Sequence, residues 1–299
     1  MKQRGPGWSD SPEGRDVVHD GVGLGGGLLP ALPRSGAGPD EGGGRGVHSQ
    51  LAAFGVRSPK ELEMNDRQVS SATDRVDMAK LLNDHLEIDP RHAAVITIDC
   101  HRGHLDLAVA TMPLAPQAAA SVVAATARLL RLARGCGMSV IHVITQNRIL
   151  PLGRPEALCN PFWAALEETR QAPISRHNLV GTVQTQLMPE LGPEPGDMVI
   201  DRKRRLSIYQ GTDLDMTLQE LGIDTVLLAG INTNTCVLCA AFESLNRDLR
   251  TVVVSDCVQT MYGDELHYLS LQNIARCVGW VVTVDELAAK MEAKRALAR

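Results

Sequence analysis

From Arg91 to the C-terminus, short apolar runs alternate with segments of helical periodicity, and this alternation constrains the fold more than any other feature. The apolar runs are rich in Val, Ile and Leu and have the length of buried strands. They span residues 93–99, 138–145, 197–201, 225–230, 251–256 and 279–284. Because strands that are apolar throughout are buried on both faces, the pattern predicts a doubly wound α/β fold. We expect three layers, with a mainly parallel six-stranded sheet between helices on both faces.

The segments between these runs predict the helices. They span residues 115–137, 155–170, 213–222, 237–249, 264–277 and the terminal stretch from residue 285. The first and third of them end in glycine, the residue that most often stops a helix.

The N-terminal part of the chain has a different character. Residues 1–63 are dominated by Gly and Pro and show no sustained strand or helix periodicity. Such a segment buries too little apolar area to offset its ordering entropy, so we expect a disordered or non-native extension. Met64 is then a candidate natural start, and a functional tail is the alternative. We expect residues 64–90 to form a lead-in helix or arm, and residues 91–299 to form one domain.

Composition limits the partners and the compartment. The chain has 299 residues, 44% of them hydrophobic, and a formal net charge of −5, so nothing favours nucleic acid or an anionic membrane as a partner. No apolar run reaches the roughly 18 to 20 residues that span a bilayer, and the N-terminus lacks a signal or transit pattern. The seven cysteines are an odd number and suit a reducing compartment, so we expect a cytoplasmic protein.

Three residues with reactive side chains follow the predicted strands. Asp99 closes the first strand, Lys203 lies just past the strand that ends at Asp201, and Cys236 follows a short polar turn and opens a helix. The carboxyl ends of parallel strands open into one crevice, so these side chains are expected to meet. A thiol at a helix N-terminus beside a lysine favours the thiolate, and a carboxylate could accept its proton. Alone, each residue more often has a structural role; their shared edge favours nucleophilic attack on an amide.

The pair Cys236 and Cys239 leaves several interpretations open. A Cys-x-x-Cys can be a redox pair, half of a zinc site, or one reactive thiol beside an inert one. No further zinc ligands have suitable spacing, and the aromatic and Gly-Pro surroundings of a thioredoxin-like site are missing. We expect Cys239 to pack as a small hydrophobic residue against the sheet.

Two segments carry a resemblance to a known family. "AAVITIDCHRGHLD" and "GDMVIDRKRRLSIYQGTDLDMTLQELGIDTVLLAGINTNTCV" resemble the strand with the catalytic Asp and the diagnostic region of the isochorismatase-like cysteine hydrolases, which include nicotinamidases and N-carbamoylsarcosine amidohydrolases. The pattern Lys-x-x-x-Ser-x-aromatic-x-Gly-Thr-x-Leu is matched by Lys203, Ser207, Tyr209, Gly211, Thr212 and Leu214. The resemblance runs from Ala93 to the C-terminus and implies that residues 91–299 form an isochorismatase-like hydrolase domain.

The resemblance implies a site and a reaction. It places a catalytic triad at Asp99, Lys203 and Cys236, with a cis peptide between Ile231 and Asn232. The backbone N–H groups of Thr235 and Cys236 would then form an oxyanion hole. The implied activity is hydrolysis of a C–N bond in a small carboxamide, ureido or N-carbamoyl compound through a thioester. The partners implied are a small-molecule substrate and further copies of the chain, in a dimer or tetramer.

The chain also departs from the family pattern. "VITQNR" stands where metal-dependent nicotinamidases carry an Asp-x-His segment, so we expect no metal and no other cofactor. Seven residues are predicted to contact the substrate, although the sequence signal for each of them is not specific. They are His101, His104, Asn147, Arg148, Trp163, Tyr209 and Asn232. Any of Arg102, Arg148 and Arg204 that lined the pocket would favour a carboxylate on the substrate.

Other functions remain open at this point. A vinyl-ether hydrolase like isochorismatase itself needs no cysteine nucleophile, so Cys236 argues against it. A catalytically silent interaction protein on the same fold is a further alternative, because a fold does not fix a function.

Overall fold

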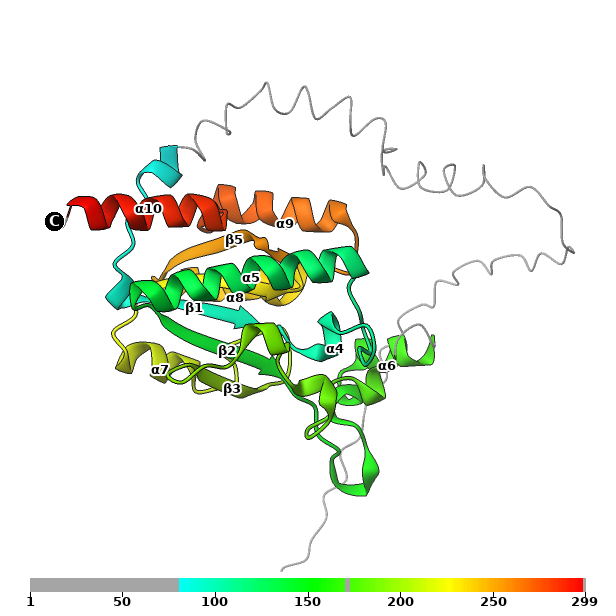
Figure 1. Cartoon of the computed structure of the whole chain (residues 1–299). Helices are drawn as coiled ribbons and strands as arrows, with labels where there is room; N and C mark the ends of the chain where they lie inside the picture. Colours follow the sequence, from blue (N-terminus) through cyan, green and yellow to red (C-terminus); the bar gives the residue numbers. More distant parts are fainter. Residues whose placement is uncertain (1–80, 170–172, 298–299) are drawn as a thin grey trace, which may run out of the picture. The chain divides into compact units, whose positions relative to one another are not determined.

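The computed structural model describes residues 81–169 and 173–297 (Figure 1). The expectation for residues 1–63 lies outside the described residues, as does most of that for residues 64–90. Within the latter range, residues 81–84 are helical, and Leu86 and Ile88 are buried in the core. These two side chains anchor the beginning of the described chain to the domain.

A six-stranded sheet forms the centre of the domain, and every neighbouring pair of its strands is parallel. Its order is β3-β2-β1-β4-β5-β6. The strands are β1 (Ala93–Ile98), β2 (Ser139–Thr145), β3 (Met198–Lys203), β4 (Thr225–Ile231), β5 (Arg250–Gln259) and β6 (Trp280–Val282). All six predicted strands are present, and β3 runs on to Lys203 instead of ending at Asp201.

Helices cover both faces of the sheet, which confirms the three-layer prediction. They are α4 (Arg102–Leu105), α5 (Pro116–Cys136), α6 (Pro161–Glu168), α7 (Leu214–Glu220), α8 (Leu238–Leu245), α9 (Asp264–Cys277) and α10 (Val284–Leu297). One core lies between the sheet and α5 with α10, and a second core lies between the sheet and α7, α8 and α9. Figure 1 shows α5 crossing in front of the strands. No helix of the described residues is long and apolar enough to cross a membrane.

The strands contribute side chains to both cores. Successive residues of β1 alternate between them, with Val95 in the core under α5 and Ile96 in the core under α8. Because side chains of a strand point to opposite faces in turn, a strand that is covered twice must be apolar at every position. The fully buried β1 and β4 meet this requirement along their whole length.

The strand order creates a crevice at the centre of the sheet. From β1 the chain moves outward through β2 to β3, then returns to place β4 on the other side of β1. The connections after β1 and β4 therefore leave in opposite directions, and ligands of open α/β sheets bind at such a point. The predicted reactive residues follow the strands around it.

Gly230 allows β1 and β4 to approach each other closely beside this crevice. It pairs with Ile98 in the register and has φ +119°. A Cβ atom at this position would lie 2.0 Å from the backbone oxygen of Ile98. Glycine fits this position because it has no Cβ atom and readily adopts a positive φ.

Candidate functional site

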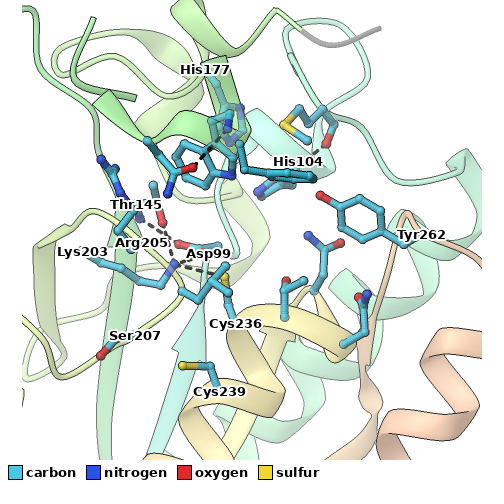
Figure 2. A pocket seen from close by; sticks show the side chains of 18 of the residues that line it. Asp99, His104, Thr145, His177, Lys203, Arg205, Ser207, Cys236, Cys239 and Tyr262 are labelled. Atoms are coloured by element: carbon cyan, nitrogen blue, oxygen red, sulfur yellow. Dashed lines mark hydrogen bonds and ion pairs between the residues drawn. The ribbon is translucent and has the colours of Figure 1, made fainter. Parts of the chain in front are cut away.

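The predicted triad lies at the carboxyl edge of the sheet, where four segments meet (Figure 2). Asp99 directly follows β1, and Lys203 is the last residue of β3. Cys236 lies in a π-helical turn, Thr233–Val237, between β4 and α8. Thr145 ends β2 and pairs with Lys203 in the register. The fold thus brings together residues that lie more than a hundred positions apart in the sequence.

The ammonium group of Lys203 joins these residues. Its Nζ lies 2.6 Å from Oδ2 of Asp99 and 2.7 Å from Oγ1 of Thr145. It also lies 3.3 Å from Sγ of Cys236. A lysine ammonium has three N–H donors, so these three contacts satisfy all of them. The lysine is fixed between a carboxylate that could accept a proton and a thiol that could lose one.

Asp99 is held by its own backbone and by a neighbouring strand. Its φ of +54° lies in the left-handed region, where Asp is tolerated better than most residues. Its Oδ1 accepts the Thr145 N–H at 2.8 Å. A register shift between Val143 and Thr145 places one extra residue of β3 before Lys203, a device that often re-aims side chains next to active sites.

The charges of the triad follow from burial and contact. Burial by itself raises the pKa of Asp99, but the charge and hydrogen bond of Lys203, together with the nearby His101 and His104, outweigh it and hold that pKa well below its ordinary value. Burial lowers the pKa of Lys203, but Asp99 and Cys236 bring it above its ordinary value. Burial also raises the pKa of Cys236, and the opposing charge of Lys203 does not cancel the rise. The resting site is therefore carboxylate, ammonium and neutral thiol, whereas the sequence favoured a thiolate.

The backbone around the nucleophile is partly committed to internal bonds. The peptide between Ile231 and Asn232 is cis, as the resemblance implies. The Thr235 N–H donates to the Asn232 carbonyl at 3.1 Å, and so does the Val237 N–H at 3.1 Å. An oxyanion would therefore have to share the Thr235 N–H with that carbonyl.

Two asparagine side chains offer further donors on the same turn. Oδ1 of Asn232 accepts the Met261 N–H at 3.1 Å, and a backbone N–H can only donate. This bond fixes the amide orientation and leaves Nδ2 of Asn232 as the free end of a side chain that lines the cavity. Oδ1 of Asn234 accepts a hydrogen bond from the Thr260 hydroxyl at 2.6 Å. Both amide groups can donate to an oxygen in the cavity.

A cavity of about 760 Å³ opens at the triad. Three of the residues with weak sequence signals line it: His104, Trp163 and Asn232. Phe162, next to Trp163 on α6, also lines it. Of the seven residues predicted to contact the substrate, only these three are therefore in a position to reach it.

The other four predicted contacts do not line the cavity. Tyr209 is buried with its hydroxyl 2.7 Å from Oγ of Ser244. The guanidinium of Arg247 lies 3.9 Å from the centre of its ring. Tyr209 thus packs against α8 and does not line the cavity.

Asn147, Arg148 and His101 are occupied elsewhere. Nδ2 of Asn147 donates to the His177 carbonyl at 3.0 Å and fixes the loop after β2. Arg148 forms a 2.8 Å ion pair with Glu156. His101 is fully buried, with its Nε2 3.9 Å from Oδ1 of Asp99.

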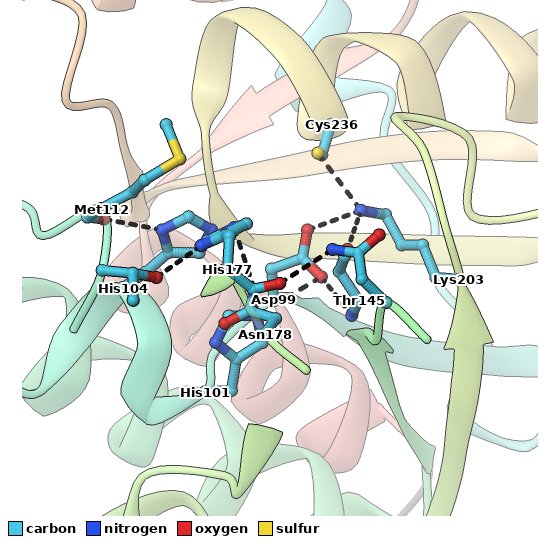
Figure 3. A network of polar contacts seen from close by, with 11 residues as sticks. Asp99, His101, His104, Met112, Thr145, His177, Asn178, Lys203 and Cys236 are labelled. Atoms are coloured by element: carbon cyan, nitrogen blue, oxygen red, sulfur yellow. Dashed lines mark hydrogen bonds and ion pairs between the residues drawn. The ribbon is translucent and has the colours of Figure 1, made fainter. Parts of the chain in front are cut away.

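Three imidazole rings lie close together next to the triad, and two of them, those of His104 and His177, line the cavity (Figure 3). The His101 ring stacks on the His104 ring with 5.0 Å between centroids, and the His177 ring lies 5.1 Å from the His104 ring at a tilted angle. Burial lowers the pKa of His101 to about 3 and also lowers the pKa of the other two. All three are therefore neutral at pH 7. Within residues 81–169 and 173–297, no group of three or more His, Cys, Asp or Glu side chains could hold a metal ion.

The environment of Cys239 differs from the prediction. Its side chain is half-buried and lines the cavity instead of packing against the sheet. Its Sγ lies 3.7 Å from Oε2 of Glu243, one helical turn further along α8. Burial raises the pKa of the Cys239 thiol to about 11, and the glutamate charge adds to the effect. Cys239 is thus a neutral thiol at pH 7, and of the two thiols only that of Cys236 is hydrogen-bonded to Lys203.

Several residues of the cavity escaped sequence analysis. Thr145 could have been found as the last residue of a strand adjacent to those of Asp99 and Lys203. His177 comes from the long connection between β2 and β3, which has no regular period to predict its course. Arg205 lines the cavity, whereas the three arginines singled out from the sequence do not.

Comparisons with known proteins agree with this geometry. The isochorismatase domain family matches residues 93–286. A maleamate amidohydrolase of Pseudomonas putida is 33% identical over 196 residues, which cover 64% of this chain and 84% of that protein. A ureidoacrylate amidohydrolase of Methylobacterium radiotolerans is 30% identical over 214 residues, 67% of this chain and 79% of that protein. The structure of N-carbamoylsarcosine amidase from Thermoplasma acidophilum has a TM-score of 0.52 at 25% identity and covers 64% of this chain and 96% of its own. The chain belongs to the isochorismatase family.

Proposed function

We propose that the protein is a cysteine amidohydrolase that cleaves the C–N bond of a small carboxamide, ureido or N-carbamoyl compound without a metal. The observation that carries the proposal is the contact of one buried ammonium, that of Lys203, with both Asp99 and Cys236. Relatives named for maleamate and for ureidoacrylate hydrolysis support the reaction class.

The first step activates the thiol. The Cys236 thiol gives its proton to the Asp99 carboxylate while the sulfur attacks the carbonyl carbon of the substrate. The negative charge moves from Asp99 to the sulfur and then to the substrate oxygen. Lys203 contacts both the initial and the intermediate site of this charge, so it remains a counter-ion throughout.

The tetrahedral oxyanion is bound by the turn that carries the nucleophile. Its donors are the backbone N–H groups of Cys236 and Thr235, the latter shared with the Asn232 carbonyl. The free Nδ2 of Asn232 is the additional donor. Donors that are already oriented stabilise the developing charge without reorganising.

Collapse of this intermediate breaks the C–N bond. Protonated Asp99 gives its proton to the leaving nitrogen, and ammonia or an amine departs from a thioester on Cys236. Water then attacks the thioester carbon, and Asp99 accepts a proton from that water. When the C–S bond breaks, the carboxylic acid leaves and the proton returns to the sulfur, which restores the resting site.

His104 orients the amide group of the substrate. Its Nδ1 lies 2.8 Å from the Met112 carbonyl, and a carbonyl can only accept a hydrogen bond. Nδ1 therefore carries the proton, and Nε2 of the neutral ring is an acceptor. We infer that Nε2 accepts an N–H of the substrate in the cavity, which His104 lines.

The test of the proposal is ammonia release from a panel of small amides and ureido acids, with the full chain. Cys236→Ala should abolish release and keep the thermal unfolding midpoint, whereas Cys277→Ala, which removes an exposed thiol on α9, should change neither. Mass spectrometry of the quenched wild-type enzyme should find an acyl group on Cys236. Undiminished turnover by Cys236→Ala would overturn the proposal, and turnover without an acyl-enzyme would favour a vinyl-ether hydrolase.

Assembly and location are part of the same proposal. We expect a cytoplasmic homo-oligomer, a dimer or tetramer, in which residues 91–299 form the hydrolase domain. Light scattering of the full chain measures the assembly, and a monomer at working concentration would contradict it.

A further inference from the structure

Arg205 differs from Arg102, Arg148 and Arg204 in having no anionic partner among the described residues. Arg102 pairs with Asp106 at 2.7 Å, and Arg148 and Arg204 both pair with Glu156. Arg205 lines the cavity, and no carboxylate of the described residues forms an ion pair with it. A guanidinium is charged at every pH that a protein tolerates. The cavity therefore contains a permanent positive charge that forms no ion pair within the described part of the protein.

The position of this charge is fixed by its surroundings. Nη1 of Arg205 donates to the Arg204 carbonyl at 2.7 Å, and Nη2 donates to the Glu156 carbonyl at 3.3 Å. The guanidinium carbon lies 5.1 Å from the centre of the Trp163 ring, within the range of a cation–π contact. Two of the five guanidinium donors are thereby used, and the others remain for a ligand. Figure 2 includes Arg205 among the side chains that surround the triad.

Among the charged groups that line the cavity, Arg205 is the cation without an ion pair in the described part of the protein. Lys203 and Asp99 neutralise each other in a 2.6 Å ion pair. Glu243 also lines the cavity and balances Arg205 in the formal charge count, but its Oε1 accepts the Ser207 hydroxyl at 2.7 Å and it forms no ion pair with Arg205. A substrate that brings a negative charge next to Arg205 would satisfy the unpaired donors. Its carbonyl group must at the same time reach Cys236.

We propose that Arg205 binds a carboxylate of the substrate, so that the substrates are amides, ureido compounds or N-carbamoyl compounds that carry a carboxylic acid. The identification rests on the proposed function and specifies its substrate class. A single planar guanidinium matches a carboxylate in shape and charge, because two parallel N–H donors meet two oxygens. A phosphate dianion would call for a second free cation, and the described lining of the cavity provides none.

Binding can be measured without turnover. The full-length protein is alkylated at Cys236 by neutral iodoacetamide, and the rate is followed by peptide mass spectrometry. The probes are succinamate and N-carbamoylglycine, each compared with its neutral counterpart, succinamide and N-carbamoylglycinamide. We expect the acids to protect Cys236 at concentrations about 10- to 100-fold lower than the neutral compounds, as charge-assisted hydrogen bonds allow.

The variant that tests the assignment is Arg205→Gln, and Arg148→Gln is the matched control. Arg148→Gln removes an arginine of the same neighbourhood, bound to Glu156 outside the cavity. Arg205→Gln should abolish the preference for the acids and leave protection by the neutral compounds within about 3-fold. Arg148→Gln should retain the preference. A thermal unfolding midpoint near that of the wild type shows that Arg205→Gln is folded, and Arg205→Lys provides a second variant that keeps the charge.

The results separate this inference from the proposed function. Equal protection by acids and neutral compounds, an absence of protection by either acid, or an unchanged preference in Arg205→Gln would overturn the role of Arg205. Ammonia release bears on the proposed function alone: acids that protect Cys236 through Arg205 without being hydrolysed would contradict the function and retain the binding site. Where the acids are hydrolysed, kcat/KM should fall in Arg205→Gln chiefly through KM.

Discussion

Nζ of Lys203 lies 2.6 Å from Oδ2 of Asp99, and the two side chains are 1% and 2% exposed. Because both side chains are almost completely buried, bulk water solvates neither charge well. Each charge therefore offsets the desolvation cost of the other. A buried pair of this kind is weak evidence for stability, but the loss of one member leaves an uncompensated charge. Function and folding are therefore coupled at this contact.

Lys203→Met should destabilise the protein through the carboxylate that it leaves behind. We expect a loss of about 3–5 kcal/mol in the free energy of unfolding, measured by urea denaturation. The double variant Lys203→Met with Asp99→Asn should recover part of that loss and remain inactive. Losses that simply add in the double variant would show that the two charges do not depend on each other.

Asp99→Asn should make Cys236 more reactive toward iodoacetamide while it abolishes turnover. Burial raises the pKa of Cys236 above its ordinary value, Lys203 lowers it, and the Asp99 charge adds to the rise. Removal of that negative charge lowers the thiol pKa, so the thiolate fraction at pH 7 increases. The rate of alkylation against pH, measured by mass spectrometry, should shift to lower pH. A shift to higher pH, or none, would contradict the charge assignment.

The sequence predicts the fold and the triad for one physical reason. Runs buried on both faces must be apolar throughout, and the order of strands places their carboxyl ends together. Asp99, Lys203 and Cys236 could therefore be placed on one edge from their positions alone. The thiol's protonation state could not, because it depends on how completely Cys236 is buried.

The substrate contacts were less predictable because side-chain direction decides them. Arg204 and Arg205 are neighbours in the sequence, but one pairs with Glu156 and the other lies over Trp163 in the cavity. The amino-acid sequence alone does not show which of the two arginines enters the cavity. The same holds for Tyr209, whose position in the family pattern suggested the substrate and whose hydroxyl contacts Ser244.

His104 should be replaceable by a residue that keeps an acceptor but not by an apolar one. Its pKa is lowered by burial, so the neutral ring persists below pH 6.5 and the acceptor is present throughout the neutral range. We expect His104→Leu to reduce kcat/KM by about 10- to 100-fold and His104→Gln to retain most of it. Initial rates against substrate concentration provide the measurement. Equal losses in both variants would exclude an acceptor role.

Tyr209→Phe should change stability and leave the reaction intact. The hydroxyl contacts Ser244, and burial raises the pKa of Tyr209 to about 12, so the phenol is neutral. Its loss should cost about 1–2 kcal/mol, because a buried hydrogen bond is removed and Ser244 is left with an unpaired hydroxyl. Urea denaturation measures this cost, and ammonia release should remain within about 2-fold of the wild type. A large fall in kcat/KM would instead indicate that Tyr209 contacts the substrate, as the sequence suggested.

Gly230→Ala should destabilise the protein and, with it, the geometry of the site. Its φ of +119° disfavours any side chain, and a Cβ atom would lie 2.0 Å from the backbone oxygen of Ile98, the residue before Asp99. The strands β1 and β4 would have to separate at the point where they position Asp99 and the turn of Cys236. We expect a loss of about 3 kcal/mol or more in urea denaturation and a lower kcat in the folded fraction. Gly135→Ala is the matched control, because a Cβ atom there meets nothing within 4 Å and alanine favours the helix α5. Similar unfolding curves for the two variants would show that the close approach of β1 and β4 does not require glycine.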